Sequence, residues 1–364
     1  MDREIRVILS GGGTMGSVSP LLAIRDKMME QNINSRFIWV GTENGPEKNI
    51  IEKEGIEYRV IKSGKFRRYF SFKNFIDPFN VLLGIFQSMS LISKFKPDVI
   101  LSAGGFVSVP LIIAGKLKGT KTFVHQQDIV PGLANKVMAR YAKVITVSFK
   151  KSLDDFKGKN AKLTGNPVRP RIFQGNRETG LQTFQLEPEL PTLVVMGGSL
   201  GAEKINQLVI ESVAKLIDFC QIIHLAGQGN IIEWVDKAQF GAKASRYHVY
   251  EYIHEELPDL YAVADLIVCR AGLSTLTEIA ALKKASMLIP IPNNQQEVNA
   301  EYFSKQNAVI SLKQDDLDSE EFVRLIRGLF DSNSSLGNLS RNITDVMQPN
   351  AAERYVDLIL EEIK

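Results

Sequence analysis

The sequence is poor in cysteine, histidine and tryptophan, and it has no long uninterrupted hydrophobic run. Cys220 and Cys269 are its only cysteines and lie in apolar runs without CxxC spacing, which excludes a disulfide framework and a thiolate zinc site. No stretch reaches the roughly 18 to 20 apolar residues of a membrane-spanning helix, and the charged start MDREIRVILS is unlike a signal peptide. We expect a chain that is neither inserted nor exported and works in a reducing, cytoplasmic setting.

At 364 residues the chain is too long for one ordinary domain, so we expect two domains of roughly 180 residues with a cleft between them. Hydrophobic residues make up 44% and charged residues 23%, which excludes a disordered or fibrous protein. The net charge of +3 conceals an asymmetry. Residues 1–164 carry 26 Lys and Arg against 14 Asp and Glu, whereas the rest carry 18 against 27. The first half should therefore prefer anionic surroundings.

Short β-branched runs alternate with amphipathic segments along almost the whole chain. This alternation predicts an α/β protein of two tandem doubly wound domains, each a parallel sheet covered by helices. A Gly- and Pro-containing cluster at 165–170 marks the linker, so we place the domains at 1–164 and 165–349. A last amphipathic helix at 350–364 could pack back on the first domain. The expected strands are residues 5–9, 37–40, 99–101, 122–124, 144–147, 193–196, 222–225, 247–250, 266–269 and 287–289.

Each expected domain has a glycine-rich turn directly after its first strand, at 11–16 and at 197–201. Ligands of open parallel sheets bind at the carboxyl ends of the strands, where such turns aim helix N-termini at anions. The first turn also fits a dinucleotide fingerprint, but no acidic residue follows at the expected spacing. A nicotinamide cofactor and a purely structural turn are its alternatives. The second turn suits a diphosphate, and its alternative is a helix capped by Ser199 with nothing bound.

Two later motifs have the chemistry of a nucleotide-sugar site. In 269–278 a strand ends in a glycine turn, and Glu278 lies one helical turn beyond Ser274, where a carboxylate can accept both hydroxyls of a ribose. In 293–300 Asn and Gln amides can exchange hydrogen bonds with sugar hydroxyls. The alternatives are an ordinary exposed glutamate and a solvated helix start. The pattern Asp316-Leu317-Asp318 is interpreted as the charged first turn of a helix rather than as a metal site.

The segment 65–75 interleaves cations with aromatic residues and leads into an apolar stretch at 79–92. Such segments are typical of contact with a membrane surface. Nucleic acid would also attract this charge, but no nucleic-acid motif accompanies it. The other alternative is that the phenylalanines pack in the core. The residues expected to face an anionic membrane are Lys65, Phe66, Arg67, Arg68, Phe70, Phe72, Lys73 and Phe75.

Seven motifs together resemble the MurG-type GlcNAc transferases of glycosyltransferase family 28 in order and in spacing. They span nearly the whole chain and are Gly12-Gly13-Thr14 with Pro20, 104–108, 125–128 with 132–135, 165–169, 197–202, 270–278 and 295–299. The resemblance implies the GT-B fold, in which two Rossmann-like domains face each other across a cleft. It also implies a peripheral membrane enzyme that makes lipid II.

By this resemblance the second domain binds UDP-GlcNAc as a substrate, with no cofactor and no metal. The glycine turn would meet the diphosphate, Glu278 would take the ribose, and the start of the following helix would help to neutralise the leaving group. The expected donor-binding residues are Arg169, Gly198, Ser199, Leu273, Ser274, Glu278, Gln295 and Gln296. The first domain would hold the polyprenyl-diphosphate-linked acceptor at Gly13, Thr14, Gly16, Ser17, Gly104, Gly105 and Phe106.

The sequence departs from the family's pattern on the acceptor side. The family usually has Gly, His, Tyr, Glu and Asn where this chain has Met15, Ser17, Phe106, Gln126 and Asp128. Neither Ser17 nor Gln126 has a basic site at neutral pH, so Asp128 and His125 remain as candidates for the catalytic base. Asp128 could instead bond a donor-sugar hydroxyl. His125 directly follows an apolar strand and could instead be structural.

These observations predict an inverting, metal-independent hexosyltransferase at the cytoplasmic face of the cell membrane. It would move GlcNAc from UDP-GlcNAc to a polyprenyl-diphosphate-linked sugar, with lipid I as the default acceptor in peptidoglycan precursor synthesis. Three alternatives stay open. They are a relative with a different lipid-linked acceptor, as in a pseudomurein-type or other envelope pathway, a UDP-GlcNAc 2-epimerase, and a non-catalytic UDP-sugar binder.

Overall fold

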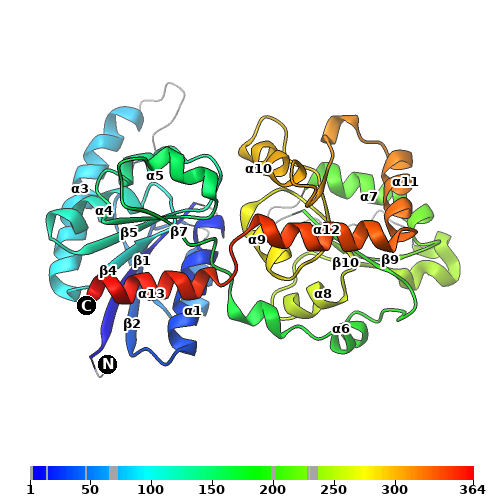
Figure 1. The fold of residues 1–364 in the computed structure, drawn as a ribbon, viewed down its shortest axis with the longest axis horizontal. Helices are drawn as coiled ribbons and strands as arrows, with labels where there is room; N and C mark the ends of the chain where they lie inside the picture. The colour runs from blue at the N-terminus through cyan, green and yellow to red at the C-terminus, as the bar shows by residue number, and fades with distance from the viewer. Residues whose placement is uncertain are drawn as a thin grey trace. The chain divides into compact units, whose positions relative to one another are not determined.

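The computed structural model describes residues 3–13, 15–45, 47–64, 73–197, 202–227, 229 and 237–364. The chain divides into two compact units. Unit 1 comprises residues 1–170 with 348–364, and unit 2 comprises residues 171–347. Each unit is a parallel sheet covered by helices (Figure 1). The prediction of two Rossmann-like domains in tandem is confirmed.

The sheet of unit 1 has seven strands in the order β3-β2-β1-β4-β5-β6-β7. The strands are β1 (Ile5–Ser10), β2 (Ser35–Gly41), β3 (Glu57–Val60), β4 (Val99–Ser102), β5 (Lys121–Gln126), β6 (Val144–Val147) and β7 (Ala161–Leu163). The central strands β1 and β4 are mostly apolar and almost entirely buried because helices cover both of their faces. All five strands expected in this domain are present, and the additional β3 and β7 are the two edges of the sheet.

Successive residues of β1 point to opposite faces of the sheet and so enter two different cores. Val7 and Leu9 pack with one set of helices, whereas Ile8 packs with another. The first set is α1 (Ser19–Glu30), α2 (Lys48–Lys53) and α13 (Ala351–Ile363). The second set is α3 (Lys73–Phe95), α4 (Ser108–Leu117) and α5 (Leu133–Met138). The short η1 (Met15–Ser17) and η2 (Lys150–Phe156) complete the described helices of this unit.

The sheet of unit 2 has six strands in the order β10-β9-β8-β11-β12-β13. The strands are β8 (Thr192–Met196), β9 (Gln221–Leu225), β10 (Tyr247–Tyr250), β11 (Leu266–Cys269), β12 (Ser286–Leu288) and β13 (Ile310–Ser311). The helices are α6 (Arg177–Thr183), α7 (Glu203–Leu216), α8 (Leu257–Val263), α9 (Leu273–Ala281), α10 (Gln295–Ser304), α11 (Ser319–Phe330) and α12 (Asn333–Val346), with η3 (Pro170–Gln174), η4 (Lys237–Arg246) and η5 (Gln314–Asp316). Helices α7 and α11 pack together over one face of the sheet.

Unit 1 extends past the predicted boundary at residue 164, as far as Pro170. The reason is that the segment after β7 is bonded to unit 1. The backbone N–H groups of Thr164 and Gly165 donate to the carbonyl of Val147, and the side chain of Asn166 bonds to His125. The chain returns to unit 1 at residue 348, where α13 packs on α1 and buries Tyr355 among other side chains (Figure 1).

Candidate active-site loops

The glycine loops after β1 and β4 lie against each other in unit 1. Gly105 has φ +91, and a Cβ at this position would come within 2.6 Å of the carbonyl oxygen of Gly12. Gly104 has φ +113, so both residues occupy backbone conformations that favour glycine. The hydroxyl of Ser108 lies 2.9 Å from that of Ser10, which ties the start of α4 to the end of β1. The structure therefore brings the two predicted acceptor loops together.

The other expected acceptor residues lie close to these loops or outside the described part of the chain. Ser17 lies in η1, and its hydroxyl donates to the carbonyl of Gly12 over 3.3 Å. Gly16 is in the same short helix, and the half-buried Phe106 packs against the core beneath α4. Thr14 lies outside the described residues.

The fully buried carboxylate of Glu47 supports the first glycine loop, and sequence reasoning did not single it out. Its Oε2 accepts the N–H of Gly13 at 3.3 Å, and its Oε1 accepts the hydroxyl of Tyr58 at 3.3 Å. The nearest acidic residue after the second strand is Glu43, which lies beyond the spacing that the dinucleotide pattern expects. Glu47 lies further along the chain, and its carboxylate is the one that bonds to the first glycine loop.

Gln126 organises the loop that carries Asp128. Its amide nitrogen donates to the carbonyl of Asp128 at 2.6 Å, and its Oε1 accepts from the side-chain amide of Asn135 at 2.7 Å. A glutamate, which the family usually has here, lacks a donor for the first of these bonds. Gln126 is buried and Asp128 is half-buried. The two departures from the family pattern are therefore coupled, because one residue holds the backbone of the other.

His125 is fully buried on β5, and both of its ring nitrogens have partners. Nδ1 lies 2.9 Å from the hydroxyl of Thr146, and Nε2 lies 2.9 Å from Oδ1 of Asn166. Burial lowers the pKa of His125 to about 4, although the hydrogen bond that its ring donates to Oδ1 of Asn166 opposes this. A histidine that is buried, bonded on both sides and neutral supports the structural alternative. Its proposed role as a base stays untested.

Unit 2 contains a second buried histidine in a similar setting. His224 bonds to the hydroxyl of Tyr247 and to Oδ1 of Asn206, each at 3.0 Å, and burial lowers its pKa to about 4. Above pH 6.5 both histidines are neutral in the folded and the unfolded chain. Between pH 6.5 and about 4 the unfolded chain takes up protons that the folded chain does not, so stability is lost as the pH falls through this window.

We predict that each histidine contributes a loss on the order of 2 kcal/mol in the free energy of unfolding between pH 7 and pH 4.5. Denaturant unfolding at several pH values checks this. The variant His125→Gln should unfold with a flatter pH profile, since one titrating group is gone. An equally steep profile for the variant would show that the pKa of His125 is the same in the folded and the unfolded chain.

In unit 2 the carboxyl ends of β11 and β12 carry the described part of the predicted donor site. Leu273 and Ser274 form the first turn of α9, whose N-cap residue Gly272 offers no side-chain cap. The hydroxyl of Ser274 is buried and makes no hydrogen bond to a described residue. The first N–H groups of α9 are thus available to an anion, as the predicted role of this turn requires. Gly198 and Ser199 lie outside the described residues.

Arg270 and Asn299 hold the turn before α9 in place. Arg270 donates to the carbonyl of Ile289 after β12 at 2.8 Å, and Asn299 of α10 donates to the carbonyl of Ala271 at 3.1 Å. Asn299 is buried. These bonds join the β11–α9 turn to the next loop and helix, so the predicted ribose and sugar contacts belong to one connected substructure.

Gln295 and Gln296 form the first turn of α10, which the side chain of Asn294 caps by accepting the N–H of Gln296 at 3.2 Å. The side-chain carbonyl of Gln296 accepts the N–H of Ile291 at 3.2 Å, which closes the preceding turn. Glu278 follows one turn after Ser274 on α9 and is half-buried. Its Oε2 accepts the hydroxyl of Tyr261 at 2.7 Å.

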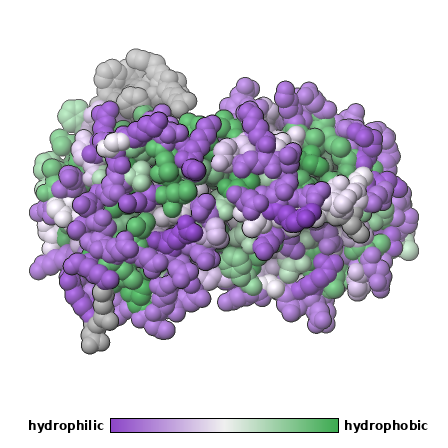
Figure 2. Space-filling view, viewed as in Figure 1, coloured by the Kyte–Doolittle hydropathy of each residue, from purple (hydrophilic) through white to green (hydrophobic). Residues whose placement is uncertain are grey.

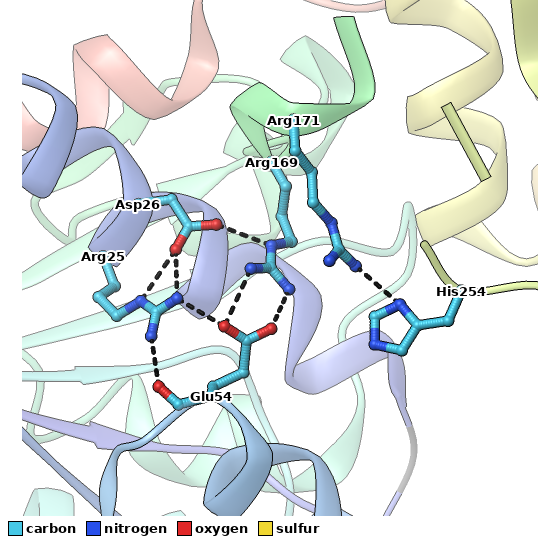
Figure 3. A network of polar contacts seen from close by, with 6 residues as sticks. All are labelled: Arg25, Asp26, Glu54, Arg169, Arg171 and His254. Carbon is cyan, nitrogen blue, oxygen red and sulfur yellow. Dashed lines mark hydrogen bonds and ion pairs between the residues drawn. The ribbon is translucent and has the colours of Figure 1, made fainter. Parts of the chain in front are cut away.

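Arg169 lies in an ion-pair network of unit 1 (Figure 3). Its Nε donates to Asp26 at 2.7 Å, and its two terminal nitrogens donate to Glu54 at 2.6 and 3.1 Å. Arg25 bonds to the same two carboxylates. Burial raises the pKa of Glu54, but the bonds and charges of Arg169 and Arg25 outweigh it and lower that pKa to about 2. The predicted contact of Arg169 with a diphosphate would compete with this network.

We predict that Arg169→Ala lowers the free energy of unfolding by about 1 to 3 kcal/mol, because two partly buried carboxylates lose a bonded cation while Arg25 remains. Thermal unfolding at neutral pH measures the loss. UDP titration of Arg169→Ala separates the anchoring role of Arg169 from its predicted contact with the diphosphate. Lys27→Ala, which removes a more exposed ion pair on α1, is the control. A variant of unchanged stability with greatly weakened UDP binding would contradict the anchoring role.

Among the described residues, no three or more His, Cys, Asp or Glu side chains group as they would to hold a metal ion. Asp318 is the N-cap of α11 and accepts the N–H of Glu321 at 2.8 Å, as the interpretation of the DxD pattern requires. Within the described ranges no helix is both long enough and apolar enough to cross a bilayer. Lys65, Phe66, Arg67, Arg68, Phe70 and Phe72 lie outside those ranges, and Lys73 and Phe75 begin α3.

Two family models match the chain: the glycosyltransferase family 28 N-terminal domain over residues 7–147, and the C-terminal domain of the same family over residues 192–355. A Clostridium perfringens protein (strain SM101) is 39% identical over 96% of this chain and 99% of its own length. A Clostridium botulinum protein (strain Hall) is 37% identical over 99% of both. Both are named UDP-N-acetylglucosamine--N-acetylmuramyl-(pentapeptide) pyrophosphoryl-undecaprenol N-acetylglucosamine transferase.

Solved structures agree with this assignment. The crystal structure of Acinetobacter baumannii MurG matches with a TM-score of 0.76 and 25% identity over 98% of this chain and 99% of that one. A putative UDP-N-acetylglucosamine 2-epimerase from Listeria monocytogenes has a TM-score of 0.68 at 12% identity, over 98% of this chain and 96% of its own, which shows a shared fold alone. The class is thus that of two-domain glycosyltransferases with Rossmann-like sheets. The chain belongs to glycosyltransferase family 28.

Proposed function

We propose that the chain transfers GlcNAc from UDP-GlcNAc to N-acetylmuramyl-pentapeptide linked through diphosphate to undecaprenol, the step from lipid I to lipid II in peptidoglycan precursor synthesis. The match over nearly the full length to relatives of that name, covering both domains, carries the proposal. The enzyme acts as a peripheral protein on the cytoplasmic face of the cell membrane. Its partners are the two substrates and an anionic lipid surface, and nucleic acid is not among them.

Three features of unit 2 support the donor half of the proposal. The first turn of α9 has N–H groups that no described residue accepts from, and no side-chain cap, so it suits a phosphate. Glu278 is a carboxylate one turn further along the same helix, and a carboxylate can accept hydrogen bonds from the hydroxyls of a ribose. Gln295 and Gln296 present amides from α10, which Asn299 ties to the same turn. Uncharged amides match the hydroxyls of GlcNAc.

The transfer is a single displacement that inverts the configuration at C1 of GlcNAc. The acceptor hydroxyl oxygen forms a bond to C1 while the bond from C1 to the β-phosphate oxygen breaks, and UDP leaves with the electron pair. The hydroxyl proton passes to a base. Negative charge grows on the leaving phosphate, and the N-terminus of α9 stabilises it. The step therefore needs no metal or cofactor.

Asp128 is the proposed base, because it is the ionisable side chain of the loop that Gln126 holds in place. The variant Asp128→Asn keeps the shape and should lower kcat by about 10²- to 10⁴-fold with little change in donor affinity. Steady-state kinetics with a lipid acceptor and calorimetry with UDP measure the two quantities. Near-normal turnover would reduce Asp128 to a sugar contact and leave the proton to a bound water or another group.

One face of α3 supports the membrane half of the proposal. Phe79, Leu82, Leu83 and Phe86 are 75%, 52%, 48% and 61% exposed, and their spacing places them along one stripe of the helix. Figure 2 shows hydrophobic surface where Figure 1 draws α3. The opposite face packs on α4. Four large apolar side chains turned to solvent, which follow the basic segment 65–75 in the sequence, match the chemistry of an anionic bilayer.

Replacing Phe79 and Phe86 with Ser should weaken co-sedimentation with vesicles of anionic lipid by about 10-fold or more, since each buried aromatic side chain contributes roughly 1.5 to 3 kcal/mol. UDP affinity should stay unchanged. Phe173→Ser is the matched control, because Phe173 is a similarly exposed phenylalanine of unit 2. Equal co-sedimentation of all three proteins would place the membrane contact elsewhere.

Products formed from UDP-GlcNAc test the whole proposal. We expect UDP release and a GlcNAc-containing lipid only when lipid I is present. Release with another polyprenyl-diphosphate sugar but not with lipid I would favour a different acceptor, an alternative motivated by the departures at Ser17, Phe106, Gln126 and Asp128. UDP-ManNAc formed without acceptor would identify an epimerase, and binding without any product would identify a non-catalytic relative.

A further inference from the structure

The buried tyrosine Tyr261 faces Glu278 from a neighbouring helix. Tyr261 lies on α8 and is 1% exposed, and its hydroxyl donates to Oε2 of Glu278 at 2.7 Å. Among the residues that the structure describes, Glu278 is the one hydrogen-bond acceptor of this hydroxyl. The bond joins a fully buried donor to a carboxylate that is half-buried at the edge of the unit.

The two helices that carry this pair are joined a second time. Lys284 follows α9, and its Nζ donates to the carbonyls of Ala262 and Ala264 at the end of α8, at 3.2 and 3.0 Å. These bonds satisfy carbonyl groups that the end of a helix leaves without partners. They also fix the separation of α8 and α9, so the distance from Tyr261 to Glu278 does not depend on the single bond between them.

In this pair Tyr261 is the hydrogen-bond donor and Glu278 is the acceptor. An ionised carboxylate only accepts hydrogen bonds, whereas a phenol hydroxyl donates. Burial and the adjacent Glu278 raise the pKa of Tyr261 well above 10, so it remains a donor throughout the physiological range. Its bond engages Oε2 from the buried side and restricts the rotation of the carboxylate. Two hydroxyls of a ribose require acceptors in a fixed arrangement, which a carboxylate free to rotate does not hold.

We propose that Tyr261 is a positioning residue that orients Glu278 for the ribose of the donor and thereby sets the preference for a ribonucleotide over a 2′-deoxyribonucleotide. This inference rests on the proposed function, because it takes Glu278 as the ribose contact. It adds a residue that does not touch the substrate and acts only through the carboxylate.

The first test compares UDP with 2′-deoxy-UDP by calorimetry on the full chain. We expect Tyr261→Phe to weaken UDP binding by about 3- to 10-fold and 2′-deoxy-UDP binding by less, so that the ratio of the two affinities falls. In a Glu278→Ala background Tyr261→Phe should have no further effect. Tyr247→Phe is the matched control, since it removes another buried hydroxyl of unit 2, bonded to His224, and should leave the ratio unchanged.

The second test uses the orientation of the side-chain amide in Glu278→Gln. It does not require the single variant Tyr261→Phe to fold. In Glu278→Gln, Tyr261 should hold the amide oxygen and turn the NH₂ group toward the ribose, where it can donate to a hydroxyl but no longer accept from one. This variant should therefore bind UDP more weakly than the wild type. Adding Tyr261→Phe removes the donor that holds the amide oxygen, so part of the UDP affinity should return.

The outcomes separate the inference from the function on which it rests. An unchanged ratio in a folded Tyr261→Phe protein, or an equal loss for both nucleotides, would overturn the positioning role. Glu278→Gln that binds UDP nearly as well as the wild type would also overturn it. A wild type that binds UDP while Glu278→Ala has no effect would remove the ribose contact and the inference with it. A wild type that binds neither nucleotide would refute the donor site of the proposed function itself.

Discussion

The register of two parallel strand pairs is the constraint on which the rest of the structure depends. In unit 1 the last residues of β1 and β4, Ser10 and Ser102, are paired, and in unit 2 Met196 of β8 is paired with Cys269 of β11. Each pairing makes two loops start at the same level of the sheet. Backbone N–H groups, glycines and helix N-termini then gather at that edge, which is the property that makes open parallel sheets bind ligands there.

The two units use the same edge for different chemistry. In unit 1 the glycine loops touch backbone to backbone, and the buried carboxylate of Glu47 bonds to the first of them. The buried side chain of Gln126 holds the loop that carries Asp128. In unit 2 an uncapped helix start is surrounded by one carboxylate and several amides. The arrangement in unit 2 suits a ligand that combines a charged leaving group with a neutral sugar. The proposed division into an acceptor unit and a donor unit follows from this difference.

Alternation of apolar runs with amphipathic segments predicted every central strand, because strands buried on both faces need continuous apolar residues. It missed the edge strands β3, β7 and β13, since β3 and β7 are incompletely buried and β13 has only two residues. Among the candidate site residues, Ser274 and Glu278 could be predicted from the sequence because they lie one helical turn apart in the same motif. They did not find Tyr261 or Glu47, whose roles arise from contacts between segments that no local pattern relates.

The central claim is that the donor binds at the strand ends of unit 2, against the first turn of α9. Hydrogen–deuterium exchange of the full chain with and without UDP-GlcNAc tests this most directly, because exposed backbone N–H groups exchange rapidly until a ligand binds them. The account predicts that the donor slows exchange at residues 270–278 and 291–296 and leaves the loops at 11–17 and 104–106 unchanged. Slowed exchange confined to the loops of unit 1 would contradict it.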